Sequence, residues 1–137
     1  MIPILLDSNT YTLLKSSNPG DANYIAQFAT QVSVPIVVLG ELLAGFRNGT
    51  RFVENKRELD VFLAQPQVQL LNLTEATADL FGTLFAQLKS KGRTVPHNDL
   101  WIAALAFEHD FAVYSLDKHF QYIDDLKIIT KLSDLLE

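Results

Sequence analysis

The sequence predicts an α/β fold built on a mainly parallel sheet of four to five strands, with helices on both of its faces. Short runs that are apolar at every position indicate strands buried on both faces. Between these runs, apolar residues recur at the three- and four-residue spacing of helices. Because strands that alternate with helices form parallel sheets, we expect any ligand to bind where the carboxyl ends of the strands meet.

The first two predicted strands are separated by a long connection. Residues 2–6 form an apolar run that is too short for a helix and ends at Asp7, and residues 34–39 repeat the pattern with Pro35 near the start. Glu41 follows the second strand almost at once. The later predicted strands are residues 68–73, 112–116 and 126–130.

Helices are expected in the intervening stretches. Ser8, Asn9 and Thr10 offer capping oxygens to a helix that follows the first strand. Asn98 is predicted to cap a helix over residues 100–107 that is apolar on nearly all sides and therefore lies in the middle of the domain. The other predicted helices are residues 21–31, 42–48, 51–65 and 75–91, with a turn at 16–20 and a loop at 92–97.

The length and composition are those of one folded domain over residues 1–137, since 48% of the 137 residues are hydrophobic and 20% are charged. No apolar run approaches the roughly 20 residues that span a bilayer. The amino terminus lacks a basic segment and meets an acid at Asp7, so no secretory signal is expected there. The absence of cysteine excludes disulfides and thiolate metal sites and fits a cytoplasmic protein.

The net charge limits how the chain could meet nucleic acid. Eleven Lys and Arg against sixteen Asp and Glu give a charge of −5 and a pI near 5.1, which excludes coating of nucleic acid by bulk positive charge. A nucleic-acid enzyme is still compatible with this charge, because several carboxylates around one divalent cation account for a small negative excess.

Four acids stand at the predicted carboxyl ends of buried elements: Asp7, Glu41, Asp99 and Asp117. Any one of them alone is explained by helix capping or by the helix dipole. Together they would repel one another unless a cation or shared protons neutralised them. Oxygen ligands select hard ions, so the set predicts Mg²⁺ or Mn²⁺.

The chemistry that fits such a site is metal-assisted phosphodiester hydrolysis. Asp7 and Asp99 would bind the ion, Glu41 would ligate it or orient a water, and Asp117 would complete the site or hold a second ion. The short polar residues Ser8, Asn9 and Ser115 either hydrogen-bond these ligands or serve only as local caps; the sequence leaves both interpretations open.

Four segments of the sequence resemble one known family: LLDSNTYTLL, VVLGELLAGF, GRTVPHNDLWIAALA and VYSLDKHF. In order and spacing they are similar to the PIN-domain ribonucleases, specifically the VapC-type toxins of toxin–antitoxin pairs. The resemblance implies a PIN-like α/β/α sandwich in which the four acids are the catalytic metal-binding residues. It also implies Mg²⁺- or Mn²⁺-dependent endonucleolytic cleavage of RNA, inhibition by a small antitoxin, and a homodimer. Ser115 stands where threonine is common in the family.

Histidine and tryptophan add little to this interpretation. His97, His109 and His119 show no zinc-ligand spacing and no serine-triad pattern, so we interpret them mainly as structural or surface residues. His97 and His119 are near Asp99 and Asp117 in the sequence, so contact of either with a phosphate or a leaving group is the alternative. Trp101 is interpreted as a packing residue and not as a platform for a nucleic-acid base.

Basic and apolar residues suggest surfaces for partners. Arg47, Arg51 and Arg93 either contact RNA phosphates at the rim of the acidic site or belong to solvated helix faces. Apolar residues on two neighbouring helices are more numerous than one small core is expected to cover, and the resemblance implies that an antitoxin helix binds there. These residues are Leu42, Leu43, Phe46, Phe52, Leu59 and Phe62.

Other functions compete with that of a toxin. The same domain could act in RNA maturation or decay without an antitoxin, and only a neighbouring gene would separate the two. A non-catalytic binding module is disfavoured because all four acids are present. A phosphatase with an aspartyl nucleophile is disfavoured because Asp7-Ser8-Asn9 lacks the second acid of a D-x-D motif.

Overall fold

A computed structural model describes residues 3–17 and 31–131 of the chain. The helix predicted over residues 21–31 falls on a stretch of which only Gln31 is described. The observed elements, in chain order, are β1 (Ile4–Leu6), α1 (Ser8–Ser17), β2 (Val32–Pro35), α2 (Ile36–Asn48), α3 (Phe52–Leu63), β3 (Val68–Leu71), α4 (Glu75–Ser90), α5 (His97–His109), β4 (Ala112–Tyr114), the 3-10 helix η2 (Lys118–Tyr122) and β5 (Ile128–Ile129).

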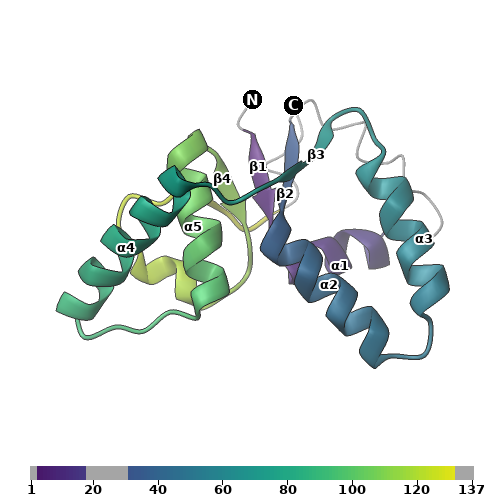
Figure 1. Ribbon diagram of the computed structural model, residues 1–137, viewed down its shortest axis with the longest axis horizontal. Helices are drawn as coiled ribbons and strands as arrows, with labels where there is room; N and C mark the ends of the chain where they lie inside the picture. The colour runs from purple at the N-terminus through teal and green to yellow at the C-terminus, as the bar shows by residue number, and fades with distance from the viewer. Residues whose placement is uncertain (1–2, 18–30, 132–137) are drawn as a thin grey trace.

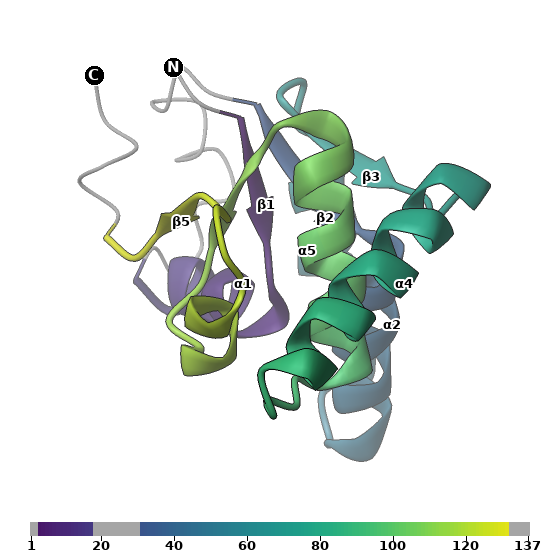
Figure 2. The same ribbon diagram turned by 90° about the vertical axis from the view of Figure 1, so that its left-hand side faces the viewer.

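The five described strands form one parallel sheet in the order β3-β2-β1-β4-β5, which confirms the predicted fold class. Helix α1, which follows β1, lies on one side of the sheet, and α4 and α5, which connect β3 to β4, lie on the other (Figures 1 and 2). The strand order therefore reverses between β1 and β4. In open parallel sheets this reversal opens a crevice for ligands at the carboxyl ends of the two strands.

The core forms where helices cover both faces of this sheet. Figure 1 places α4 and α5 on one side of the sheet and α1 and α3 on the other, with α2 leading from the end of β2 towards α3. Every residue of β1 and β4 is buried. Helix α5 buries Leu100 and the run from Ile102 to Ala106, as its apolar sequence predicts for a central helix.

The second predicted strand was placed too late in the chain. The strand was predicted over residues 34–39, but the observed strand β2 ends at Pro35 and Ile36 begins α2. Val38 is buried as a helical residue. A short apolar run has the same pattern in a buried strand and in the first turns of a buried helix, so its sequence could not separate the two.

The turn after α4 depends on a glycine. Gly92 has a φ of +70°, and the backbone N–H groups of Gly92 and Arg93 donate to the carbonyls of Lys89 (3.0 Å) and Leu88 (2.9 Å). This is a Schellman ending, in which a left-handed residue lets the last carbonyls of a helix be satisfied. The turn sends the chain back towards the start of α5. No helix in the described parts of the chain is long and apolar enough to cross a membrane.

Candidate active site

Asp7 is a buried carboxylate at the carboxyl end of the central strand β1, with 6% of its surface exposed. Its Oδ1 accepts the backbone N–H of Thr10 at 2.8 Å, and the Thr10 hydroxyl accepts the backbone N–H of Asp7 at 3.1 Å. The same hydroxyl lies 2.8 Å from Asp7 Oδ1 and 2.9 Å from the carbonyl of Tyr114. Asp7 is therefore the N-cap of α1 and Thr10 completes a capping box with it, so the capping oxygen predicted at Thr10 is confirmed while the cap itself is Asp7 and not Ser8 or Asn9.

Ser115 joins Asp7 to Asp117. Leu6, the last residue of β1, pairs with Tyr114, the last residue of β4. Asp7 and Ser115, which follow them, therefore lie side by side. The Ser115 hydroxyl donates to Asp7 Oδ2 and accepts the backbone N–H of Asp117 at 3.0 Å. Since Ser115 is 1% exposed, it holds these groups without competition from water.

Ser8 and Asn9, the other predicted neighbours of the acids, have different surroundings. The carbonyl of Ser8 accepts the Thr12 hydroxyl at 3.0 Å within α1, and Asn9 is exposed. The hydrogen bonds described at the Asp7 carboxylate come from Thr10 and Ser115. Thr10 and Ser115 therefore support the Asp7 carboxylate, while a contact of Ser8 or Asn9 with the metal or its waters stays a prediction.

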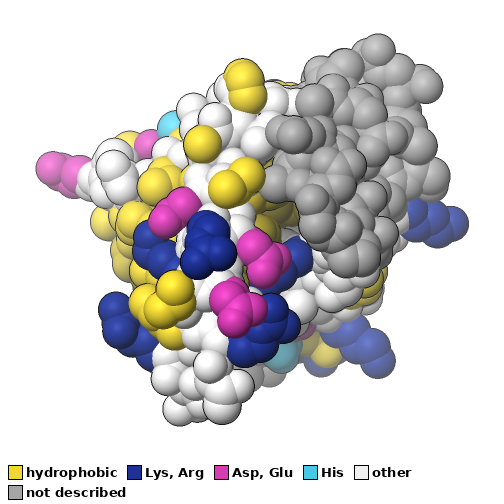
Figure 3. All heavy atoms as spheres, turned by 90° about the vertical axis from the view of Figure 1, so that its right-hand side faces the viewer, with side chains coloured by type: hydrophobic (Ala, Val, Ile, Leu, Met, Phe, Trp, Pro, Cys, Tyr) yellow, Lys and Arg dark blue, Asp and Glu magenta, His cyan; other side chains and the backbone are white. Residues whose placement is uncertain are grey.

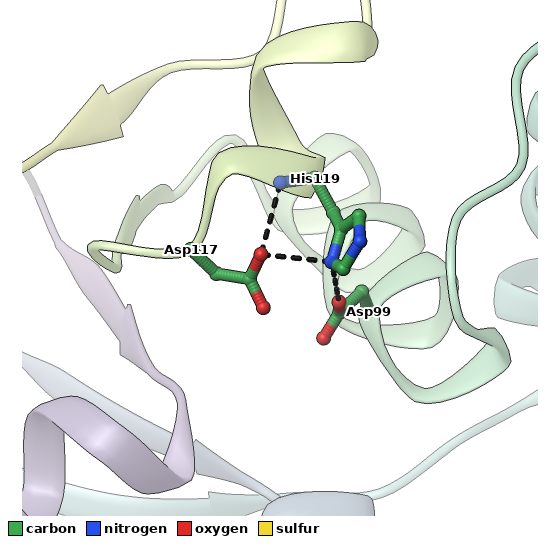
Figure 4. Close-up of side chains that lie close together, drawn as sticks. All are labelled: Asp99, Asp117 and His119. Carbon is green, nitrogen blue, oxygen red and sulfur yellow. Dashed lines mark hydrogen bonds and ion pairs between the residues drawn. The ribbon is translucent and has the colours of Figure 1, made fainter.

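Asp99, Asp117 and His119 converge from two elements, as Figure 4 shows. Asp99 is in the first turn of α5, while Asp117 caps η2 by accepting the backbone N–H of His119 at 2.9 Å. His119 Nδ1 lies 2.8 Å from Asp117 Oδ1 and 3.5 Å from Asp99 Oδ2. One ligand atom from each of the three side chains lies within 4.8 Å of the other two. The carboxylates of Asp99 and Asp117 are 16% and 29% exposed.

The pKa of Asp99 responds to burial and to the charges of the other three acids. Burial raises the pKa of Asp99 from 3.8 to about 6, and the negative charges of Asp117, Asp7 and Glu41 act in the same direction, against the opposing effect of His119. Burial and like charges both disfavour an ionised carboxyl. The site therefore concentrates negative charge that a cation would neutralise.

Glu41 approaches this region from α2. It was expected directly after the second strand, but it lies in the sixth position of α2 because β2 ends at Pro35. Its side chain is exposed. Its charge acts on Asp99, although it is the smallest of the contributions to the pKa of that residue. Glu41 is thus the outermost of the four acids.

Comparison with known proteins identifies the family. A family model described as PIN domain matches residues 4–126, which include all four acids. The chain belongs to the PIN domain family. Ribonuclease VapC4 of Mycobacterium tuberculosis is 30% identical over 97 residues, which cover 71% of this chain and 75% of that relative. The predicted resemblance to VapC-type PIN-domain ribonucleases is therefore confirmed.

Solved structures share the fold of this PIN domain at lower sequence identity. The VapBC2 complex of Rickettsia felis, bound to a DNA fragment from its promoter, matches with a TM-score of 0.80 and 22% identity over 93% of this chain and 98% of that one. VapBC-5 of Mycobacterium tuberculosis, from the VapBC family of toxin–antitoxin systems, has a TM-score of 0.69 and 23% identity over 96% of this chain and 100% of that one. These matches confirm the α/β/α architecture.

The donor set of this PIN domain suits a hard divalent ion. Asp99 and Asp117 supply carboxylate oxygens, His119 supplies a nitrogen within the same cluster, and Asp7 and Glu41 add negative charge. Carboxylates are the usual protein ligands of Mg²⁺ and Mn²⁺. The chain has no cysteine. The residues present therefore fit the predicted ion, and His119, interpreted from the sequence mainly as a structural or surface residue, has a nitrogen within the same cluster.

The predicted phosphate contacts lie on exposed parts of the PIN domain. The Arg47 guanidinium lies 4.1 Å from the centroid of the Phe52 ring, and that of Arg93 lies 4.5 Å from the centroid of the Tyr122 ring. Arg51 pairs with Glu54 within α3. Figure 3 shows basic and acidic side chains interleaved on the face that includes α3, which is typical of a solvated helix surface.

The six apolar residues predicted to exceed one small core on α2 and α3 are divided between the core and the surface, and the antitoxin contact expected there stays a prediction. Leu42, Leu59 and Phe62 are buried, and Leu43, Phe46 and Phe52 are partly buried. Phe62, for example, meets the edge of the Tyr11 ring with 5.2 Å between centroids, because α3 packs beside α1. The exposed large apolar residues of α3 are Val53 and Val61.

The remaining aromatic residues pack as the sequence suggests. Trp101 stacks on Phe81 with 4.2 Å between ring centroids, and this contact joins α5 to α4. His97 contacts Phe81 and Phe85 edge to face and is exposed. His109 lies 3.7 Å from Glu108, on the far end of α5 from Asp99.

Proposed function

We propose that this PIN domain is a Mg²⁺- or Mn²⁺-dependent endoribonuclease and the toxin of a type II toxin–antitoxin pair. The observation that carries the proposal is the convergence of four acids at the switch point of the sheet, with the pKa of Asp99 raised to about 6. The relative VapC4 is named a ribonuclease, and VapBC-5 belongs to a family of toxin–antitoxin systems. The chemistry of the donor set supports the same activity.

The proposed roles follow from the position of each acid. Asp7, Asp99 and Asp117 would hold the ion, and Glu41, the exposed acid, would ligate it or orient a water. When bound, the ion supplies Lewis-acid catalysis, which activates water and offsets charge on the phosphodiester. Asp7 needs no rearrangement for this role, because Thr10 and Ser115 already fix both of its carboxylate oxygens.

The RNA would reach the site across exposed basic groups. Arg47 and Arg93 are proposed to contact phosphates, since both are exposed and each guanidinium lies over an aromatic ring that supports it. Arg51 is a weaker candidate because its guanidinium bonds Glu54. Affinity that depends on such contacts falls as the salt concentration rises.

Cleavage of total cellular RNA by the purified protein tests the enzymatic proposal. The wild type should cut with Mg²⁺ or Mn²⁺ and lose activity in EDTA, and Asp99→Asn should abolish cleavage. Asp79→Asn, on the exposed face of α4, is a matched control that should cut normally. Mapping of new 5′ ends would identify the target. Equal cleavage by wild type and Asp99→Asn would show that the activity comes from a contaminant.

Toxicity is tested separately from catalysis. Induction of the chain in a bacterial host should arrest growth, and co-expression of the protein encoded beside it should restore growth. An active nuclease that leaves growth unaffected would favour the alternative of RNA maturation or decay without an antitoxin. A protein that binds a partner but cuts no RNA with either ion would favour the non-catalytic module.

Homodimerisation belongs to the same proposal. Light scattering of the purified chain should give about twice the 15.4 kDa of one copy. A monomer at all concentrations would contradict the dimer and leave the nuclease proposal in place.

A further inference from the structure

We propose that His119 Nδ1 is a direct ligand of the divalent ion, so that the site has a mixed nitrogen and oxygen donor set. This inference rests on the metal site of the proposed function and adds to it a residue outside the four acids. It predicts that an imidazole, and not only carboxylates, faces the ion.

The backbone of η2 fixes the imidazole at the acidic cluster. The side chain of Asp117 caps η2 by accepting the backbone N–H of His119 at 2.9 Å, so residues 117 and 119 are held in one short turn. Figure 4 shows the His119 ring between the carboxylates of Asp117 and Asp99, with the same ring nitrogen directed towards both. Its distances of 2.8 Å and 3.5 Å to these oxygens leave the three groups close enough to share one ion.

The Nδ1 atom lacks a hydrogen-bond partner. Within the part of the chain that the structure describes, it is the one buried side-chain nitrogen or oxygen with none. The His119 side chain as a whole is 43% exposed, so the ring is accessible while this atom is not. The oxygen of Asp117 at 2.8 Å is near enough for an ion pair, but it does not lie in the direction of a hydrogen bond.

A buried polar atom without a hydrogen-bond partner destabilises the folded state and calls for an explanation such as a bound ion. A cation placed among Nδ1 and the two carboxylates would accept the nitrogen lone pair and neutralise the acids at once. An imidazolium ion pair in the metal-free protein is the alternative, and it predicts no bond between nitrogen and the metal.

The chain provides its own control in His97. This histidine lies two residues before Asp99, but its ring contacts Phe81 and Phe85 at centroid distances of 5.7 Å and 6.2 Å. It is exposed and has no place in the described ligand cluster. Replacement of His97 therefore removes an imidazole close to the site in sequence without removing the proposed ligand.

A mixed donor set should also favour Mn²⁺ over Mg²⁺. Mg²⁺ strongly prefers oxygen, whereas transition-metal ions bind imidazole more readily. The wild type should bind Mn²⁺ more tightly than Mg²⁺, and His119→Ala should lower Mn²⁺ affinity by about tenfold or more. The affinity of this variant for Mg²⁺ should fall much less, so the ratio of Mn²⁺ affinity to Mg²⁺ affinity should be smaller than in the wild type.

Electron spin-echo modulation of bound Mn²⁺ tests the ligand directly and needs no RNA. With substoichiometric Mn²⁺, the wild type and His97→Ala should show ¹⁴N modulation from a coordinated imidazole, which ¹⁵N-histidine labelling replaces by ¹⁵N modulation. His119→Ala, shown to be folded by circular dichroism, should bind Mn²⁺ without this signal. Calorimetric titration with Mn²⁺ and with Mg²⁺ supplies the two affinities.

The outcomes separate this inference from the proposed function. Mn²⁺ that binds the wild type without nitrogen modulation, or with modulation that persists in His119→Ala, overturns the inference and leaves the carboxylate site and the nuclease proposal in place. Failure of the wild type to bind either ion overturns the metal site and the inference together.

Discussion

Replacing Asp99 by asparagine is expected to stabilise the metal-free protein at neutral pH while it abolishes the proposed metal-dependent activity. The carboxylate is 16% exposed and lies near Asp117, Asp7 and Glu41. In the absence of an ion, folding must bury this charge beside like charges. Asparagine keeps the shape and removes the charge, so the folded state no longer bears this cost.

The magnitude follows from the pKa of Asp99, which rises from 3.8 to about 6 on folding. Each pKa unit corresponds to about 1.4 kcal/mol, so the ionised carboxylate destabilises the folded state by about 3 kcal/mol above pH 7. Because the folded pKa lies above the unfolded value, the folded state binds more protons and the penalty grows as the pH rises. It is about 0.5 kcal/mol at pH 4, increases between pH 4 and pH 6, and then becomes constant.

Urea denaturation in EDTA, followed by circular dichroism at several pH values, measures this difference. Asp99→Asn should exceed the wild type in free energy of unfolding by about 3 kcal/mol at pH 8, or roughly 10 °C in melting temperature. The difference should shrink towards pH 4. The control Asp79→Asn, on an exposed face of α4, should stay within about 0.5 kcal/mol of the wild type throughout.

Addition of Mn²⁺ should favour the wild type over Asp99→Asn, in contrast to the measurement in EDTA. The ion should stabilise the wild type by RT ln(1 + [Mn²⁺]/Kd), which increases with the logarithm of the Mn²⁺ concentration above Kd, and should stabilise Asp99→Asn much less. An Asp99→Asn protein that is less stable than the wild type at pH 8 in EDTA, or a stability difference that does not change with pH, would refute the argument that burial and like charges destabilise this carboxylate.

Three further predictions, two of them with a comparison substitution, test other parts of the structure by urea denaturation. Ser115→Ala removes the hydroxyl that joins the Asp7 carboxylate to the backbone N–H of Asp117. It should lower the free energy of unfolding by about 1–3 kcal/mol and the Mn²⁺ affinity, measured by calorimetry, by about 10- to 100-fold. An unchanged affinity would exclude a role of Ser115 in orienting the ligands. Gly92→Ala should lower the free energy of unfolding by about 1 kcal/mol because of the positive φ. Gly82→Ala, inside α4 with open space for a Cβ, should raise it by about 0.5–1 kcal/mol. Two changes in the same direction would contradict the role given to the positive φ. Leu105→Ala should cost about 2–5 kcal/mol, since the side chain is fully buried, against under about 0.5 kcal/mol for Val53→Ala at 69% exposure.

Sequence patterns that repeat along a whole element were sufficient to predict the fold class. Uniformly apolar strands require cover on both faces, and the apolar helix over residues 100–107 can lie only in the interior. The alternation of strands and helices then left a parallel sheet as the consistent topology. Acids that follow strands of such a sheet must meet at one edge, so the approximate position of Asp7 and Asp117 was also predictable.

Sequence patterns could not predict the burial or the secondary structure of residues whose environment is formed by segments distant in the chain. The boundary of β2 at Pro35 was missed because a buried strand and a buried helix share the same short apolar pattern. The burial of Leu59 and Phe62 depends on how α3 packs beside α1, which no local pattern records.

In the candidate site, too, some features follow from the local sequence and others only from packing between distant segments. The sequence by itself determined which carboxylates are available and that two strands bring Asp7 and Asp117 to one edge of the sheet, because the apolar pattern that marks a strand and its end is a local property. Only the tertiary structure decided that Thr10 and Ser115 fix Asp7 and that the ring of His119 lies between Asp117 and Asp99. Those contacts depend on the register of β1 with β4 and on the position of η2 beside α5, which arise from packing among segments up to about a hundred residues apart in the chain.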